Sequence, residues 1–248
     1  MMRDPYKWGL AVVLGSVLGL LAVIGVSAPA SAFDITSCTS VASAPAGTTR
    51  FDFRANLSTC PDGSFNFPSN SVVFMNGAVI VGPGADHLSL PTGISLGSNS
   101  FLLGPGVVRG WTACVVGGND VAVEGVHLNQ CATGVQLGES YKVKEVMIHD
   151  CTPSSFIGTG MFLTHGGFIE SSIVRACDFG VVTGQNNKIW NLVVTRALVT
   201  GLQVEGGNAV SRTVISHPRS ILTIGLDYTD CGAAGPGGVG CQDGSNSV

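Results

Sequence analysis

The chain has 248 residues, of which 45% are apolar and 11% charged, with 35 glycines and a formal net charge of −4. This length and apolar content suffice for one domain with a continuous hydrophobic core. The chain has 12 Lys and Arg residues in all, and nucleic-acid binding depends on neutralising phosphates with such side chains. We therefore expect no nucleic-acid partner.

Residues 1–32 are predicted to be a signal peptide. Two basic residues precede an apolar run from Trp8 to Val26, and Ala30-Ser31-Ala32 has the small residues at which signal peptidase cleaves. The alternative is an uncleaved anchor, because the apolar run is nearly long enough to span a bilayer. Both interpretations predict a secreted, periplasmic or cell-surface protein, and only the anchor would hold it at a membrane.

The segments at the two ends of the remaining chain are predicted to be caps. Residues 33–68 lack periodicity and are dense in turn formers, as expected for an N-terminal cap over the open end of a repeat structure. Residues 230–248 form a Gly-rich tail that cannot bury a core. Disulfides are expected to close both ends, pairing Cys38 with Cys60 and Cys231 with Cys241.

Between the caps, residues 69–229 repeat with a period of about 20 residues, which is typical of a solenoid. Each repeat has a Gly-rich turn, short β-branched runs and a polar corner, without helical periodicity. We predict an all-β, right-handed parallel β-helix of about seven coils. The turn slot is assigned to Asn99, Asn119, Ser140, Asn187 and Asn208, and the corner column to Trp111, Cys131, Cys151, Cys177 and Ala197.

The longest repeat is interpreted as carrying an insertion near residues 164–167.

The cysteines inside the coils are interpreted as buried core thiols, since cysteine packs as a small hydrophobe. The alternative is a metal site or a redox pair, which needs thiolates at short spacing, and no Cys-x-x-Cys occurs. We therefore expect no metal and no cofactor. These inner cysteines are Cys114, Cys131, Cys151 and Cys177.

The start of the mature chain resembles a known family. Ile35-Thr36-Ser37-Cys38, Cys60, Asn76-Gly77, Gly82-Pro83-Gly84 and the run from Thr92 to Leu96 are together similar to the opening of exported bacterial right-handed parallel β-helix proteins with the pectin-lyase-like fold. The resemblance runs over most of the mature chain. In lyases and hydrolases of this architecture it implies an active site on the outer face of the first strand of each coil.

The outward positions of that first strand carry no ionisable side chain. Glycoside hydrolysis needs paired carboxylates, and elimination needs a base beside a cation held by carboxylates. We therefore assign no catalytic residue and expect a non-catalytic module, with a polysaccharide lyase or glycoside hydrolase as the alternative. The positions are Ser95, Val116, Gln136, Ile157, Val182, Gln203 and Thr223.

A polar stripe two residues before the corner column is the candidate ligand-binding site. Its Arg side chains offer bidentate hydrogen bonds to an anionic or hydroxyl-rich glycan. The alternative is a solvated edge that keeps the solenoid soluble. The expected partner is a polysaccharide or a surface protein, and a purely structural envelope or adhesion role is a third possibility. The stripe consists of Arg109, Asn129, His149, Arg175 and Thr195, with Asp150 beside it.

Four single residues are interpreted conservatively. His165 in Thr-His-Gly-Gly is similar to the Gly-His-Gly of polygalacturonases, but the motifs that accompany it there are missing, so it receives no catalytic role. Tyr141 and Trp190 are expected to fill the core, and His127 to be an ordinary surface histidine. The chain has no zinc, nucleotide-binding or Ser-His-Asp signature.

Overall fold

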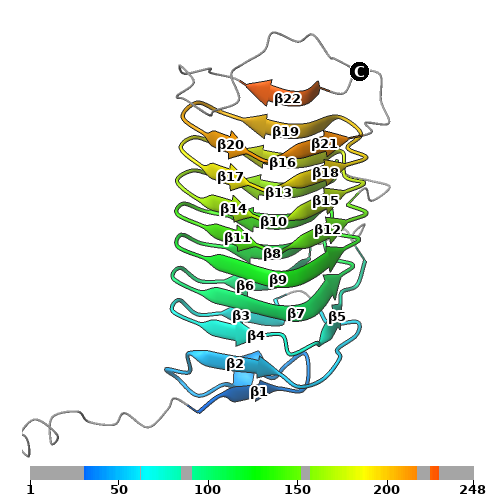
Figure 1. The fold of residues 1–248 in the computed structure, drawn as a ribbon. Coiled ribbons are helices and arrows are strands. Elements are labelled where there is room, and N and C mark those ends of the chain that lie inside the picture. The colour runs from blue at the N-terminus through cyan, green and yellow to red at the C-terminus, as the bar shows by residue number, and fades with distance from the viewer. Residues whose placement is uncertain (1–30, 62, 85–90, 152–156, 217–223, 229–248) are drawn as a thin grey trace, which may run out of the picture. The chain divides into compact units, whose positions relative to one another are not determined.

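The alternation of apolar and polar residues in each repeat produces short parallel strands that stack turn upon turn in the computed structural model of the chain (Figure 1). The structure describes residues 31–61, 63–84, 91–151, 157–216 and 224–228. Most of the predicted leader and the tail with Cys231 and Cys241 lie outside these residues. The fold is a parallel β-solenoid of about 8 turns with a period near 21 residues. The predicted all-β parallel β-helix is confirmed.

The strands form a 14-stranded and an 8-stranded sheet. The 14-stranded sheet has two arms, which the long strands β7 and β9 join. Its first arm contains β1 (Phe33–Ile35), β2 (Arg50–Phe53), β4 (Val72–Phe74), β7 (Phe101–Arg109), β9 (Ala122–Asn129), β11 (Lys142–Lys144), β14 (Phe168–Glu170), β17 (Lys188–Trp190) and β20 (Ala209–Ser211). Its second arm adds β5 (Val79–Val81), β12 (Met147–His149), β15 (Ile173–Arg175), β18 (Val193–Thr195) and β21 (Val214–Ser216).

The 8-stranded sheet forms the other wall of the solenoid. It contains β3 (Phe65–Phe67), β6 (Thr92–Leu96), β8 (Ala113–Gly117), β10 (Thr133–Leu137), β13 (Thr159–Leu163), β16 (Phe179–Thr183), β19 (Thr200–Val204) and β22 (Ile224–Tyr228). A single-turn 3-10 helix, η2 (Val41–Ser43), lies near the start of the solenoid. No helix in the described part of the chain is long and apolar enough to cross a membrane.

The core is a column of apolar side chains between the two sheets. Alternate residues of each strand point inward, so one set is buried and the other faces solvent. The predicted inward residues of one turn are each at most 2% exposed, while Gln136 and Lys142 are exposed as expected. The inward residues are Val135, Leu137, Val143, Val146 and Ile148.

A column of glycines lines the interior of the 8-stranded sheet. A Cβ at Gly134 would lie 2.5 Å from the carbonyl oxygen of Gly160 and 2.7 Å from Cγ2 of Ile148. Cβ atoms do not approach other atoms so closely, so the stacking of successive turns requires glycine here. The column continues through Gly180 and Gly201.

Residues with positive φ turn the chain at three corners of each coil. One corner column contains Asn99, Asp120, Ser140, Gly166, Asn186 and Gly207, and the other two run through Glu145 and through Asp150. The left-handed region costs an L-residue about 1–2 kcal/mol, which explains the abundance of Gly, Asn and Asp. The predicted turn slot therefore mixes three neighbouring columns: Asn99 and Ser140 lie in the corner column, Asn119 precedes it, and Asn187 and Asn208 follow it.

The inner cysteines are buried, but they are not the free thiols that we predicted. Successive turns stack the corner residues, so cysteines about one turn apart meet although no short Cys-x-x-Cys motif joins them. All three disulfides enclose loops of similar length, worth about 3 kcal/mol each in the chain-entropy model. The pairs are Cys38–Cys60, as predicted, Cys114–Cys131 and Cys151–Cys177, with Cα–Cα distances of 5.4, 5.8 and 4.7 Å. Three disulfides are typical of an oxidising compartment.

The segment 33–68 contains strands as well as turns. β1 pairs with β2, and β2 pairs with β4, so the first arm begins inside this segment. Its core is rich in phenylalanine, in contrast to the mostly aliphatic core of later turns. Phe51, Phe53, Phe65 and Phe67 pack edge to face with ring centroids 4.9–6.3 Å apart.

The extra residues of the longest repeat lie between β12 and β13, not near residues 164–167. Asn129 pairs with His149, 20 positions on, but Thr133 pairs with Thr159, 26 positions on. Thr159 then pairs with Phe179, where the spacing returns to 20. The insertion therefore precedes β13, and it changes which residues of this turn face outward.

Candidate functional site

The outer face of the 8-stranded sheet carries a column that differs from the predicted one at two turns. Phe162, and not Ile157, pairs with Gln136, because the insertion precedes β13. Asp227, and not Thr223, pairs with Gln203. Phe162 is 47% exposed. An aromatic ring thus projects from a column whose other residues are serine, valine and glutamine, with Asp227 at the register position after Gln203, so the column is not free of ionisable residues as predicted.

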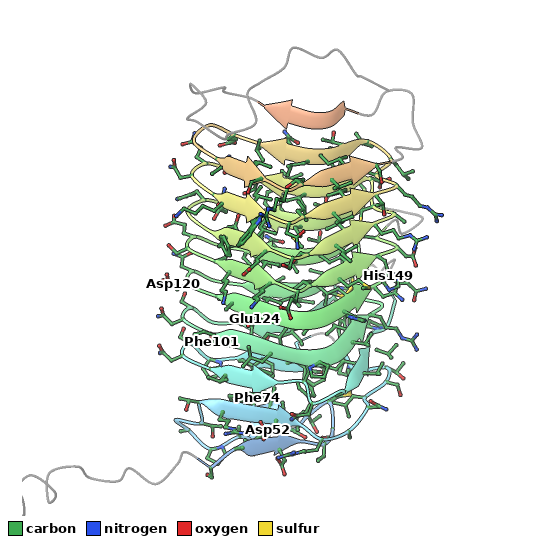
Figure 2. The ribbon with its side chains drawn as sticks, viewed as in Figure 1. Asp52, Phe74, Phe101, Asp120, Glu124 and His149 are labelled. Atoms are coloured by element: carbon green, nitrogen blue, oxygen red, sulfur yellow. A yellow bond between two sulfur atoms is a disulfide. The ribbon has the colours of Figure 1, made fainter. Side chains whose placement is uncertain are left out.

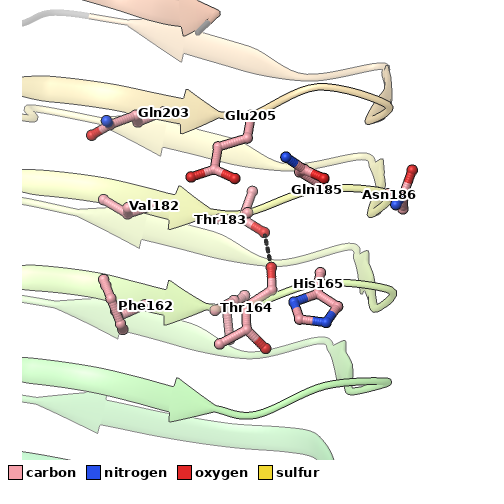
Figure 3. A pocket seen from close by; sticks show the side chains of 11 residues that line it. Phe162, Thr164, His165, Val182, Thr183, Gln185, Asn186, Gln203 and Glu205 are labelled. Carbon is pink, nitrogen blue, oxygen red and sulfur yellow. Dashed lines mark hydrogen bonds between the residues drawn. The ribbon is translucent and has the colours of Figure 1, made fainter. Parts of the chain in front are cut away.

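Beside Phe162 the surface is hollowed, with a cavity of about 370 Å³. In Figure 3, Phe162, Val182 and Gln203 stand one above another on one side, and His165, Gln185 and Asn186 lie on the other. The hollow is open to solvent and crosses three successive turns. Its lining is Phe162, Leu163, Thr164, His165, Val182, Thr183, Gly184, Gln185, Asn186, Gln203 and Glu205.

The hollow arises from a break in a second column of glycines. A glycine directly follows three early strands of the 8-stranded sheet. Gly97 follows β6, Gly118 follows β8 and Gly138 follows β10. In the later turns the residue at this position is Thr164, Gly184 and Glu205. Gly184 therefore leaves a gap between two larger residues. A Cβ placed on it would lie 2.9 Å from the carbonyl oxygen of Thr164 and 3.7 Å from Oε2 of Glu205.

The buried side-chain amide of Asn187 fixes the backbone that forms the floor of the hollow. Nδ2 of Asn187 donates to the carbonyl oxygens of Gly184 and Thr164 at 2.9 and 3.2 Å. Its Oδ1 accepts hydrogen bonds from the hydroxyl of Tyr141 at 2.9 Å and from the backbone N–H of Gly167 at 2.8 Å. A buried network with its members paired is rigid, so the floor is preorganised.

Tyr141 anchors this network from two turns away. Its ring packs over Gly167, where a Cβ would overlap the ring, and its side chain is 2% exposed. Burial raises the pKa of Tyr141 to about 12, against the opposing effect of its hydrogen bond with Thr183. The phenol therefore stays neutral and keeps donating at physiological pH. Its predicted place in the core is confirmed.

Two exposed polar side chains, His165 and Glu205, border the floor and can meet a ligand, whereas the hydroxyl of Thr164 is buried. Oγ1 of Thr164 is buried and makes no hydrogen bond among the described residues. Nε2 of His165 lies 3.1 Å from Oε1 of Glu139, and both side chains are about half exposed. The carboxylate of Glu205 has no ion-pair partner among the residues that the structure describes. The exposed side chains of His165 and Glu205 can exchange hydrogen bonds with ligand hydroxyls.

The predicted polar stripe forms one register column on the second arm of the 14-stranded sheet. The pairs Arg109–Asn129, Asn129–His149, His149–Arg175 and Arg175–Thr195 run through β7, β9, β12, β15 and β18. Nδ1 of His149 lies 3.0 Å from Oδ2 of Asp150, which occupies a positive-φ corner. The structure brings these residues together as the spacing predicted. Glycan binding by this column stays a prediction.

The outer face of the first arm offers a contrast to the hollow. Figure 2 shows Phe74, Phe101 and Glu124 across this face, with Asp120 and His149 near its two edges. Glu124 accepts a 2.6 Å hydrogen bond from Lys142, and this contact raises the pKa of Lys142. This carboxylate therefore already has a partner within the protein.

Trp190 lies on the same arm and does not fill the core as predicted. It is 41% exposed, and the guanidinium of Arg212 lies 5.4 Å from its ring centroid. The residue occupies an outward position of β17, between Glu170 and Ser211 in the register. His127 is exposed, as predicted.

Phe162 and Glu205 are the residues that sequence reasoning missed. The repeat itself contained the signal, because Gly134-Val-Gln-Leu aligns with Gly160-Met-Phe-Leu once the insertion is placed before β13. That alignment puts Phe162 in the outward slot. The step from glycine to Glu205 after β19 was likewise visible as a break in the glycine column.

The chain matches no family model, no curated protein and no solved structure. Only the geometry of the hollow and of the stripe therefore indicates a function.

Proposed function

We propose that the protein is an exported, non-catalytic β-solenoid of the pectin-lyase-like type that binds a polysaccharide across the hollow beside Phe162. The observation that carries the proposal is an exposed aromatic ring at the edge of a preorganised, hydroxyl- and amide-lined hollow. A sugar ring has an apolar face that stacks on an aromatic side chain and hydroxyls that need polar partners. Both kinds of contact are available within one cavity.

The repeat supports an extended rather than a compact ligand. Outward positions of successive turns recur about every 4.8 Å along the solenoid. Gln136, Phe162, Val182 and Gln203 therefore form a continuous track of one residue per turn. A polymer lying along this track would contact several turns, and many weak contacts would add to a useful affinity.

One observation favours a second candidate, a polysaccharide lyase or glycoside hydrolase. His165 and Glu139 form a 3.1 Å pair beside the hollow, and Glu205 supplies a second carboxylate to the lining of the hollow. A carboxylate–imidazole pair can act in general acid–base catalysis. The experiment below therefore measures turnover together with binding.

The test compares Phe162→Ala with wild type, both produced from the full-length sequence. Affinity electrophoresis through gels containing soluble polysaccharides measures binding, and the same samples are assayed for new reducing ends and unsaturated products. We expect retardation of the wild type by at least one polysaccharide without product release. Loss of the stacked ring should weaken binding about tenfold, equal to about 1.4 kcal/mol.

Phe101→Ala is the matched control, because Phe101 is 45% exposed, like Phe162, but lies on the first arm of the other sheet. Equal losses in both variants would contradict a site at the hollow. Product release that disappears in His165→Ala would establish the enzyme instead. A wild-type protein that neither binds a polysaccharide nor releases products would favour a purely structural role.

A further inference from the structure

The hollow carries a negative charge that no lysine or arginine of its described lining offsets. Among its described lining residues, Glu205 and His165 are ionisable, and Lys and Arg are absent. The imidazole of His165 faces Glu139, so any positive charge on it is already balanced. Glu205 thus leaves the hollow with an uncompensated carboxylate.

Glu205 stands where the chain has no structural need for a carboxylate. The equivalent position after four earlier strands, β6, β8, β10 and β16, is glycine. Its backbone N–H donates to the carbonyl oxygen of Thr183, which any residue could do. Its side chain is exposed, and Figure 3 shows the carboxylate reaching from its own turn toward Thr183. Removing the charge should therefore leave the fold intact.

The carboxylate lies over the floor of the hollow. Its Oε2 is 3.7 Å from the place where a Cβ on Gly184 would be. On the other side of Gly184 is Thr164, whose Oγ1 is buried without a partner in the described structure. Because that hydroxyl is buried, the charged group that a ligand on this floor would meet is the acceptor-only carboxylate of Glu205.

We infer that the ligand is an uncharged, hydroxyl-rich polysaccharide, and that Glu205 rejects polyuronates and other anionic glycans. This inference rests on the proposed function. Sugar hydroxyls donate to the carboxylate in charge-assisted hydrogen bonds. A uronate carboxylate at the same place meets a like charge without a nearby Lys or Arg to offset it. The Arg residues of the polar stripe lie on the other sheet and do not line this cavity.

The experiment uses a matched pair of ligands. The neutral polysaccharide that is retained best by the full-length protein is oxidised at its primary hydroxyls, which converts its sugars to uronic acids on the same backbone. Affinity electrophoresis at low ionic strength then measures both forms. We expect the oxidised polymer to bind at least tenfold more weakly than its parent.

Glu205→Gln keeps the shape of the side chain and removes its charge, so it should reduce this difference to less than threefold. Glu170→Gln on the outer face of β14 is the control and should leave the tenfold difference unchanged. Tighter binding of the oxidised polymer by wild type, or an unchanged difference in Glu205→Gln, would overturn the inference while leaving glycan binding in place. Absence of binding to both forms, with no effect of Phe162→Ala, would instead refute the proposed function and this inference with it.

Discussion

Raising the pH above 10 should destabilise the protein through Tyr141. The pKa of this phenol is about 12 in the folded protein because burial disfavours the phenolate, and about 10 in the unfolded chain. Between these values the folded state holds the proton more firmly than the unfolded state. The contribution is therefore fully present below pH 10 and is lost as the pH rises toward 12.

The magnitude follows from the difference between the two pKa values. Each unit corresponds to 1.36 kcal/mol, so the full loss is about 3 kcal/mol, and about 1.5 kcal/mol of it falls between pH 10 and 11.5. Tyr141→Phe does not titrate and loses only the hydroxyl's hydrogen bonds, about 1 kcal/mol at neutral pH. Its partners stay paired, because Asn187 still binds Gly167 and Thr183.

Guanidinium unfolding of wild type and Tyr141→Phe, followed by circular dichroism from pH 8 to 11.5, measures this effect. We expect wild type to be more stable by about 1 kcal/mol at pH 8 and the variant to be the more stable protein at pH 11.5. Two stability curves that stay parallel over this range would refute the reasoning.

Three variants test the packing of the solenoid by thermal unfolding. Gly180→Ala should cost about 2–3 kcal/mol, because the new Cβ would overlap the carbonyl oxygen of Gly201, and an unchanged melting temperature would show that the turns can separate. Ala176→Gly should stabilise the fold by about 1 kcal/mol, because φ is 53° there, and destabilisation would contradict the strain argument. Replacing Cys151 and Cys177 together by Ala should cost about 3 kcal/mol, and wild-type stability of the double variant would show that the cross-link is dispensable.

Much of the fold was predictable because neighbours in a solenoid are set by the repeat length. Residues one period apart stack, so the spacing of Arg109, Asn129, His149 and Arg175 predicted their common column. Strand alternation likewise predicted which side chains of one turn are buried. In such a fold a tertiary contact can be read from local spacing.

The hollow was not predictable in the same way, because it depends on where one insertion lies. A period of 26 between Thr133 and Thr159 fits extra residues at several places, and an error of a few positions exchanges Phe162 for Ile157 on the outer face. The pairing of the inner cysteines also depends on side-chain distances across turns. Orphaned groups such as Oγ1 of Thr164 become visible only when the neighbouring atoms are placed.

The aromatic core of the first turns has a consequence for the order in which the molecule assembles. A chain synthesised from its N-terminus presents Phe51, Phe53, Phe65 and Phe67 before any later turn, and the Cys38–Cys60 bridge can close there first. Each completed turn then offers a strand edge on which the next one pairs. We expect this end to act as the template, with amide exchange slowest near β2 and β3 and loss of structure starting from the opposite end.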